Sequence, residues 1–195
     1  MSARMWYTKI MKNKTLMYGI ILTIIFNLLF FVSLILCLVF GFKTPYFSIF
    51  ITFLIFAYHI DIRLIIAEFV ILVFKKNLNL HSKIFKVSDK DFKFLYKLKV
   101  KKWKDKFVAW DKSQFVITDL RDKSKVEFAL RNNITAEIIH WACFFVGLFA
   151  ILIGCLISPD EWWIYVVTAV LTSFLADLPP ILIQRFNRYR LQRLI

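Results

Sequence analysis

Four long apolar stretches, separated by short turns or polar segments, are the main feature of the chain. They cover residues 18–40, 46–74, 136–157 and 162–183. A helix needs about 20 mostly apolar residues to cross the hydrocarbon core of a bilayer, so each stretch is long enough to do so. The pattern predicts four membrane-spanning helices. The turns "GFKTP" and "SPDE" then lie on one side of the membrane, and the longer polar segments lie on the other.

The polar positions fall mainly in residues 75–133 and 184–195. Within the first segment, "FKFLYKLKVKKW" (residues 92–103) mixes apolar side chains with lysines, as in a basic amphipathic helix that lies among lipid headgroups. The stretch that follows has Asp and Ser turns, which indicates a loop with a short helix. We therefore expect an all-α integral membrane protein in a single domain, residues 1–195. It would be a four-helix transmembrane bundle with a cytoplasmic loop that carries an amphipathic helix.

Charge sets the predicted orientation. Residues 1–17, 75–133 and 184–195 hold 25 of the 27 Lys and Arg residues, and four spans place all three segments on one side. The excess of positive charge makes that side cytoplasmic. We expect a multi-pass protein of the cell membrane with both termini in the cytoplasm. The net charge of +14 does not indicate nucleic acid, because basic residues beside apolar spans suit anionic headgroups whatever the function.

Composition and motifs exclude several classes of protein and kinds of site. The chain is 59% hydrophobic, with 22 Phe but only 4 Gly and 4 Pro, which is too apolar for an ordinary soluble domain. The first span is too long for a removable signal peptide, so we expect it to stay in the protein. The three cysteines all lie in apolar spans without paired spacing, which argues against a disulfide or a metal site. No glycine-rich phosphate loop or serine hydrolase motif is present.

Ionisable residues interrupt the second span. His59, Asp61, Arg63 and Glu68 stand where apolar residues are expected. His59 and Arg63 are four residues apart and share a helix face, whereas Asp61 points elsewhere. Charged groups at membrane depth mark functional sites, or they pair with neighbouring helices, or long side chains reach back to the interface. The sequence leaves these alternatives open.

The third span begins with a candidate acid–base pair. Glu137 and His140 are one helical turn apart, so a carboxylate could orient an imidazole that accepts a proton. The plainer alternative is an interfacial histidine and a glutamate that favours the start of a helix. In the fourth span, Pro179 and Pro180 should break or kink the helix just after Asp177, and broken helices at membrane depth commonly line a cavity.

A single polar pocket would explain these residues together. It would gather side chains from the cytoplasmic half of spans two, three and four, namely His59, Arg63, Glu68, Glu137, His140, Asp177, Gln184, Arg185, Asn187 and Arg188. No Ser or Cys stands in a nucleophile context, so direct attack by a substrate hydroxyl deprotonated by His140 is favoured over a covalent enzyme intermediate. The arginines suit a donor that carries phosphate or carboxylate.

The motifs "YHIDIRL", "LYKLKVKKWKDK", "AEIIHW" and "ADLPPILIQRFNRYRL" occur in an order that resembles the glycosyl-4,4'-diaponeurosporenoate acyltransferase family, over roughly residues 55–195. The best markers are Trp103-Lys104-Asp105, Ala136-Glu137 with His140, and Gln184-Arg185-Phe186-Asn187-Arg188. Family members typically read Gln-Arg-Tyr-Asn-Arg-Pro-Arg at the last marker. This chain has Phe186 in place of Tyr and Tyr189 in place of Pro.

The resemblance implies transfer of a fatty acyl group to a sugar hydroxyl of a glycosylated carotenoid at the cytoplasmic membrane. It implies membrane lipid and glycolipid substrates, no resident cofactor, and an acyl donor such as a phosphate-bearing thioester as co-substrate. The roles predicted from the residues are catalysis by His140, Glu137, His59 and Asp177, and substrate binding by Arg63, Gln184, Arg185, Asn187, Arg188 and Trp103. Oligomer formation stays open.

Two other classes of function remain at this stage. One is another membrane group transferase, such as a methyltransferase with a cytosolic cofactor. The other is a non-enzymatic lipid-binding or accessory protein whose buried charges only fix helix packing. A transporter is disfavoured because the hydropathy shows no inverted repeat.

Overall fold

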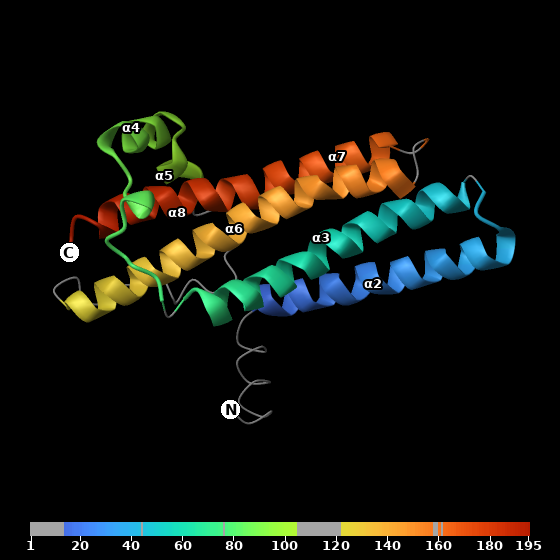
Figure 1. Ribbon diagram of the computed structural model, residues 1–195, viewed down its shortest axis with the longest axis horizontal. Coiled ribbons are helices and arrows are strands. Elements are labelled where there is room, and N and C mark those ends of the chain that lie inside the picture. The colour runs from blue at the N-terminus through green and yellow to red at the C-terminus, as the bar shows by residue number, and fades with distance from the viewer. Residues whose placement is uncertain (1–13, 44, 76, 105–121, 158–159, 161) are drawn as a thin grey trace, which may run out of the picture. The chain divides into compact units, whose positions relative to one another are not determined.

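The computed structural model describes residues 14–43, 45–75, 77–104, 122–157, 160 and 162–195. The described residues form helices and turns, and no β-strand occurs among them (Figure 1). Four helical runs are long and apolar enough to cross a membrane: Gly19–Phe40, Tyr46–Val73, Lys123–Leu156 and Trp162–Leu191. The prediction of an all-α chain with four spans is confirmed.

The first two spans are single helices, α2 (Lys14–Phe40) and α3 (Tyr46–Val73). The third is α6 (Lys123–Ile157). The fourth consists of α7 (Trp162–Thr172), a π-helical turn (Ser173–Asp177) and α8 (Leu178–Leu191). The π-helical turn ends just before Pro179 and Pro180, which occupy the first turn of α8, where a missing N–H costs no helical hydrogen bond. The helix therefore changes its winding where the sequence predicts a break.

Two element boundaries differ from the sequence prediction. The third span begins at Lys123, well before Ala136, and takes in residues for which we expected a loop with a short helix. Its first turns bury Val126, Ala129 and Leu130, which recur at helical spacing. The C-terminal stretch is also helical as far as Leu191. The helices thus carry their polar ends well beyond the apolar stretches.

We predicted one continuous amphipathic helix over residues 92–103, and this is wrong because the stretch forms two short helices. A 3-10 turn (Lys83–Phe85) precedes α4 (Asp89–Lys97), and α5 (Val100–Trp103) follows. Ser88 and Asp91 form a reciprocal capping box that starts α4. Lys99 has a left-handed backbone, with φ of 55°, and this turns the chain between the two helices.

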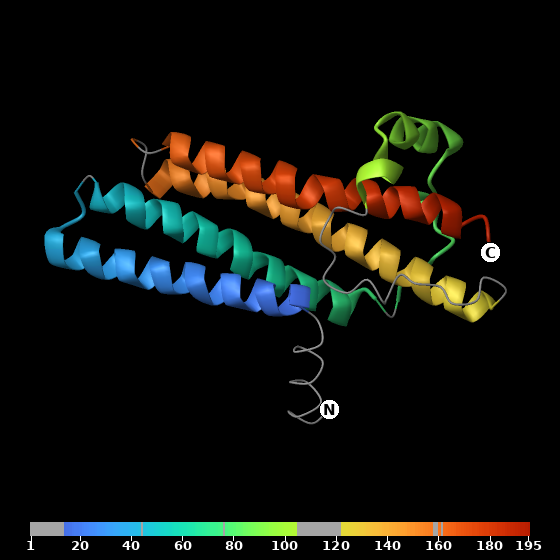
Figure 2. The same cartoon turned by 180° about the vertical axis from the view of Figure 1, so that it is seen from behind.

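The chain divides into two compact units. Unit 1 contains Met1–Ile65 with Cys143–Leu175, and unit 2 contains Ile66–Ala142 with Ala176–Ile195. In unit 1, α2 and α3 run side by side in opposite directions (Figures 1 and 2). Stacked aromatic pairs join them, with ring centroids 5.1 Å apart for both Phe26–Phe56 and Phe40–Tyr46. Asn27 also donates a hydrogen bond of 3.1 Å to Asp61.

Two glycines allow close packing inside unit 1. A methyl group on Gly154 would lie 2.0 Å from the ring of Tyr165, which belongs to a core cluster with Ile51, Ile55 and Ile164. A methyl group on Gly147 would lie 2.7 Å from Ser173 Oγ and 3.1 Å from the ring of His59. Only residues without a side chain fit at these two positions without a shift in the neighbours.

In unit 2, α4 and α5 pack against α8 (Figure 1). The buried side chains of Leu95, Val100 and Phe186 form their common core. The ring of Phe92 stacks on that of Tyr189, with centroids 3.9 Å apart, and the Tyr189 hydroxyl donates a hydrogen bond of 2.6 Å to Asp89. A second core joins Leu80, Leu130 and Ile134.

Candidate functional site

A ladder of polar contacts joins α6 to the last helical run within unit 2. We call it the α6–α8 seam. Its members are Asn133, Glu137, His140, Asp177, Gln184, Arg185 and Arg188. The α6 members are spaced by four and three residues, so they share a helix face. Five seam residues are buried, which is unusual for polar side chains. Buried polar groups need hydrogen-bond or ion-pair partners, and the seam residues supply them to one another.

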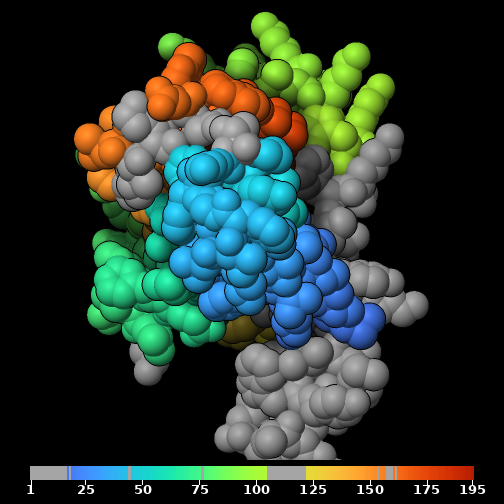
Figure 3. Space-filling view, turned by 90° about the vertical axis from the view of Figure 1, so that its right-hand side faces the viewer, coloured from blue at the N-terminus to red at the C-terminus, as the bar shows by residue number. Residues whose placement is uncertain are grey.

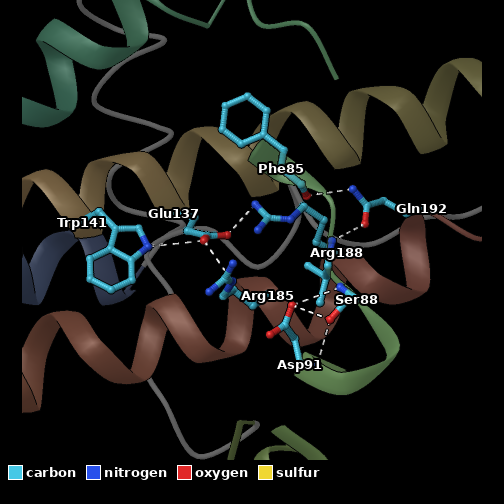
Figure 4. Close-up of polar contacts among 9 residues, drawn as sticks. Phe85, Ser88, Asp91, Glu137, Trp141, Arg185, Arg188 and Gln192 are labelled. Carbon is cyan, nitrogen blue, oxygen red and sulfur yellow. Dashed lines mark hydrogen bonds and ion pairs between the residues drawn. The ribbon is translucent and has the colours of Figure 1, made fainter. Parts of the chain in front are cut away.

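Glu137 is the centre of the seam (Figure 4). Its carboxylate lies 2.5 Å from Arg188 Nη1 and 3.5 Å from Arg185 Nε, and Trp141 Nε1 donates to it over 3.4 Å. Only 1% of the Arg188 side chain is exposed, against 33% for Arg185. Arg188 is therefore a buried partner of Glu137, and Arg185 is the arginine that a substrate could reach.

The charges of this group do not cancel. Two guanidinium groups share one carboxylate, so Glu137, Arg185 and Arg188 together carry one excess positive charge. Arg185 is the partly exposed member of the three, so this charge lies where an anion can reach it. A planar guanidinium also matches the geometry of a phosphate or carboxylate. The arrangement can bind an anionic group at Arg185.

His140 pairs with Asp177, not with Glu137. Its Nδ1 lies 3.4 Å from Asp177 Oδ1. Asp177 is fully buried, whereas 27% of the His140 side chain is exposed. A carboxylate at Nδ1 fixes the ring orientation and leaves Nε2 as the nitrogen that exchanges a proton. The sequence placed Glu137 in the orienting role, and in the structure Asp177 occupies the position beside His140.

Asn133 and Gln184 extend the seam. The Asn133 amide donates a hydrogen bond of 2.5 Å to the Gln184 side-chain oxygen, and both residues are buried. Gln184 is a site residue predicted from the sequence, whereas Asn133 was not predicted. The spacing of Asn133, Glu137 and His140 along one face of α6 was the signal that could have found it.

Two of the predicted site residues belong to unit 1. His59 is buried beside Gly147 and Ser173. Arg63 donates hydrogen bonds to the backbone carbonyls of His59 and Thr172. The bond to His59 lies within α3, and the bond to Thr172 joins α3 to α7, as polar contacts between membrane helices do. That His59 and Arg63 share a pocket with the seam residues stays a prediction.

The two remaining predicted site residues come from α5 and α8. Trp103, in α5, donates its indole N–H to the carbonyl of Leu98 over 3.0 Å and packs beside the core of α4 and α5. Asn187 is half-buried in α8, and its side chain makes no hydrogen bond with another described residue. Asp105, the third residue of the Trp103-Lys104-Asp105 marker, lies outside the described residues.

Hydrogen bonds and nearby positive charges lower the pKa values of two carboxylates of α4. The hydrogen bond from Tyr189 and the positive charge of Arg193 lower the pKa of Asp89. Hydrogen bonds from Ser88 lower the pKa of Asp91, and the charge of Arg185 acts in the same direction. Both groups therefore favour the ionised form.

In the part of the chain that the structure describes, no group of three His, Cys, Asp or Glu side chains is placed to hold a metal ion.

These features define an α-helical membrane protein of four spans with a polar seam between its third and fourth helical runs. The model of the glycosyl-4,4'-diaponeurosporenoate acyltransferase family matches residues 69–195, which is more than half of the chain and includes the whole seam. The chain belongs to this family. A search of curated proteins and a search of solved structures each gave no significant match.

Proposed function

We propose that the protein is a membrane acyltransferase that moves a fatty acyl group to a hydroxyl of a glycolipid or glycosylated isoprenoid, with the α6–α8 seam as its active site. The observation that carries the proposal is the His140–Asp177 pair, because it joins a partly exposed imidazole to a fully buried carboxylate. Family membership supplies the acyl-transfer class.

In the proposed reaction, His140 Nε2 removes the proton of the acceptor hydroxyl. The hydroxyl oxygen attacks the acyl carbon of a thioester, and a C–O bond forms while the C–S bond breaks. The thiolate leaves and takes the proton from His140. Asp177 holds the imidazole ring and stabilises its charged form, as the carboxylate of a catalytic triad does. This route needs no acyl-enzyme intermediate.

Arg185 is proposed to bind the negative charge of the donor. The group of Glu137, Arg185 and Arg188 carries one excess positive charge, and Arg185 is its exposed arginine. Arg188 and Glu137 then act as a buried support that fixes the position of Arg185. The donor is a co-substrate and not a resident cofactor, and a phosphate-bearing thioester fits the excess charge. Gln184 positions the seam through Asn133.

The proposal includes a place and partners for the enzyme. The basic segments and both termini face the cytoplasm of the cell membrane, and the substrates are membrane lipids and glycolipids together with the acyl donor. Nucleic acid is not a partner. The proposal does not specify an oligomeric state, which can be measured on the purified protein.

The direct experiment is acyl transfer by the purified chain in lipid nanodiscs. A long-chain acyl thioester with an isotopic label in its acyl group is offered with a panel of acceptors, namely a glycosylated isoprenoid, a diacylglycerol glycoside, and each lipid without its sugar. The proposal predicts that label enters only the sugar-bearing lipids, as detected by lipid mass spectrometry.

Two outcomes contradict the proposal in different ways. An acceptor that gains the mass of another group, such as a methyl, and carries no label would indicate another group transferase. No labelled product from any acceptor, with protein that elutes as a single folded species, would favour the accessory or lipid-binding alternative. In that case the buried charges serve helix packing alone.

A further inference from the structure

The α4–α5 segment presents a strongly basic surface. We define the α4–α5 basic face by its exposed lysines: Lys83, Lys86, Lys90, Lys93, Lys97, Lys99, Lys101 and Lys102. Figure 3 shows long side chains of this segment projecting outward, in lime. The segment has only two carboxylates, Asp89 and Asp91, so the eight lysines leave it with a large excess of positive charge.

Apolar side chains are exposed among these lysines. Phe94 is 58% exposed and Tyr96 is 64% exposed, and Ile84 and Leu98 are exposed as well. The apolar residues that hold the segment in place are different ones. Leu95 and Val100 are buried with Phe186 of α8. Phe94 is not part of that core, and Tyr96 meets it only at the edge, through a tilted ring contact with Phe92 at 6.5 Å. A soluble surface rarely combines so many lysines with exposed aromatic rings, and interfacial membrane segments commonly do.

The position of the face along the chain indicates what it meets. The residues of α8 that hold it, Phe186 and Tyr189, lie in the last turns of the span Trp162–Leu191. A segment fixed to the last turns of a span lies where the apolar layer gives way to headgroups. The available partner with negative charge at that level is the anionic lipid of the same membrane.

We propose that the α4–α5 basic face binds anionic lipid headgroups of the membrane that the spans cross, with Phe94 and Tyr96 in contact with the upper acyl chains. Lysines suit this partner because their long stems lie along apolar surface while the ammonium groups reach the phosphates. The exposed rings distinguish a lipid surface from an acidic protein, for which charge alone would suffice. The inference goes beyond the proposed acyl transfer and does not depend on it.

The test measures the surroundings of α4 in the full-length protein. Phe94→Cys is introduced together with Cys155→Ser, since Cys37 and Cys143 are buried and Cys155 is exposed. The new thiol is labelled with a dye whose emission shifts to the blue in apolar surroundings. The protein is placed in nanodiscs of phosphatidylcholine alone or with added phosphatidylglycerol. We expect a blue shift in the anionic discs that is reversed near 1 M salt, where the screening length is about 3 Å.

Paired variants identify the lysines responsible. Lys93→Gln with Lys97→Gln removes two charges from the face, and Lys123→Gln with Lys125→Gln removes two exposed charges at the start of α6 as the matched control. We expect the first pair to lose most of the blue shift and the control pair to keep it. Equal emission in the two kinds of disc overturns the proposal. So does an equal loss in both pairs, because the response would then follow net charge and not this face.

Discussion

The carboxylate of Glu137 lies 2.5 Å from a guanidinium nitrogen of Arg188, and both side chains are buried. Each charge is stable there only because the other is present. The pair joins α6 to α8 one helical turn from His140, so it sets the register in which His140 meets Asp177. Stability and the proposed chemistry therefore depend on one ion pair.

Removal of the Glu137 charge should destabilise the protein strongly. Glu137→Gln leaves Arg188 buried without a counter-charge, and broken buried pairs cost about 3–5 kcal/mol. Arg185→Gln is the comparison, since Arg185 is partly exposed and its loss leaves Glu137 paired. It should cost about 1 kcal/mol or less. Thermal unfolding of both variants in one detergent measures the difference. Equal unfolding temperatures for the two variants would show that the pair does not support the fold.

Asp177→Asn should slow acyl transfer while the protein stays folded. The amide has almost the shape of the carboxylate, but it cannot hold the same imidazole tautomer or stabilise the charged ring. We expect the acyl-transfer rate to fall by about 10²–10⁴. The matched control is Asp160→Asn, an exposed aspartate in the turn before α7. The orienting role of Asp177 is refuted if turnover by Asp177→Asn stays within about a factor of two of the control.

A third prediction concerns the close packing around Gly147. Gly147→Ala places a methyl group 2.7 Å from Ser173 Oγ, so the hydroxyl and the His59 ring must shift. We expect a cost of about 1–3 kcal/mol from overpacking. Adding Ser173→Ala should recover part of that cost, since it removes the nearest atom. The free energies of unfolding of the two single variants and the double variant measure the recovery. Strictly additive costs would mean that the two positions do not touch.

The sequence predicted the spans well because hydropathy is a local property. The limits 46–74 and 162–183 agree with α3 and with the start of α7, since each apolar run is a run in the sequence itself. The start of α6 at Lys123 was missed, although Val126, Ala129 and Leu130 recur at helical spacing. Polar residues lie between these three, so no long apolar run marks this part of the helix.

The partners within the site could not be predicted in the same way. Glu137 and His140 are neighbours in sequence, so their pairing was the natural expectation. The actual partners, Asp177 for His140 and Arg188 for Glu137, depend on the register between two helices, which no local spacing specifies. The left-handed backbone at Lys99 is a similar case, because lysine carries no local signal for that conformation.

The hydrogen bond between Asn27 and Asp61 offers a fourth test. Both residues lie in apolar spans of unit 1, and their side chains meet at 3.1 Å. Hydrogen bonds between membrane helices average about 0.6 kcal/mol in double-mutant cycles. A cycle of Asn27→Ala and Asp61→Ala should therefore give a coupling near that value. A coupling indistinguishable from zero would show that the two helices do not depend on this contact.

The contact between α4 and α8 should depend on acid pH. The pKa of Asp89 is lowered in the folded protein, first by the Tyr189 hydroxyl and then by Arg193. A lowered pKa means that the contact stabilises the fold above the ordinary value of 3.8 and is lost as the pH falls through the folded value. Tyr189→Phe should raise the pKa of Asp89 toward 3.8, as measured by carbon-13 NMR titration of its carboxyl group. Tyr96→Phe, which alters an exposed ring on α4, is the control and should leave it unchanged.

His140 is the proposed base of the acyltransferase. The most direct measurement is the single-turnover rate of acyl transfer for His140→Gln beside His81→Gln, which removes an exposed histidine far along the chain from the seam. Both proteins are matched for folded fraction by size-exclusion recovery. We predict a fall of at least about 10² for His140→Gln and wild-type turnover for His81→Gln. Wild-type turnover by a folded His140→Gln would contradict this prediction.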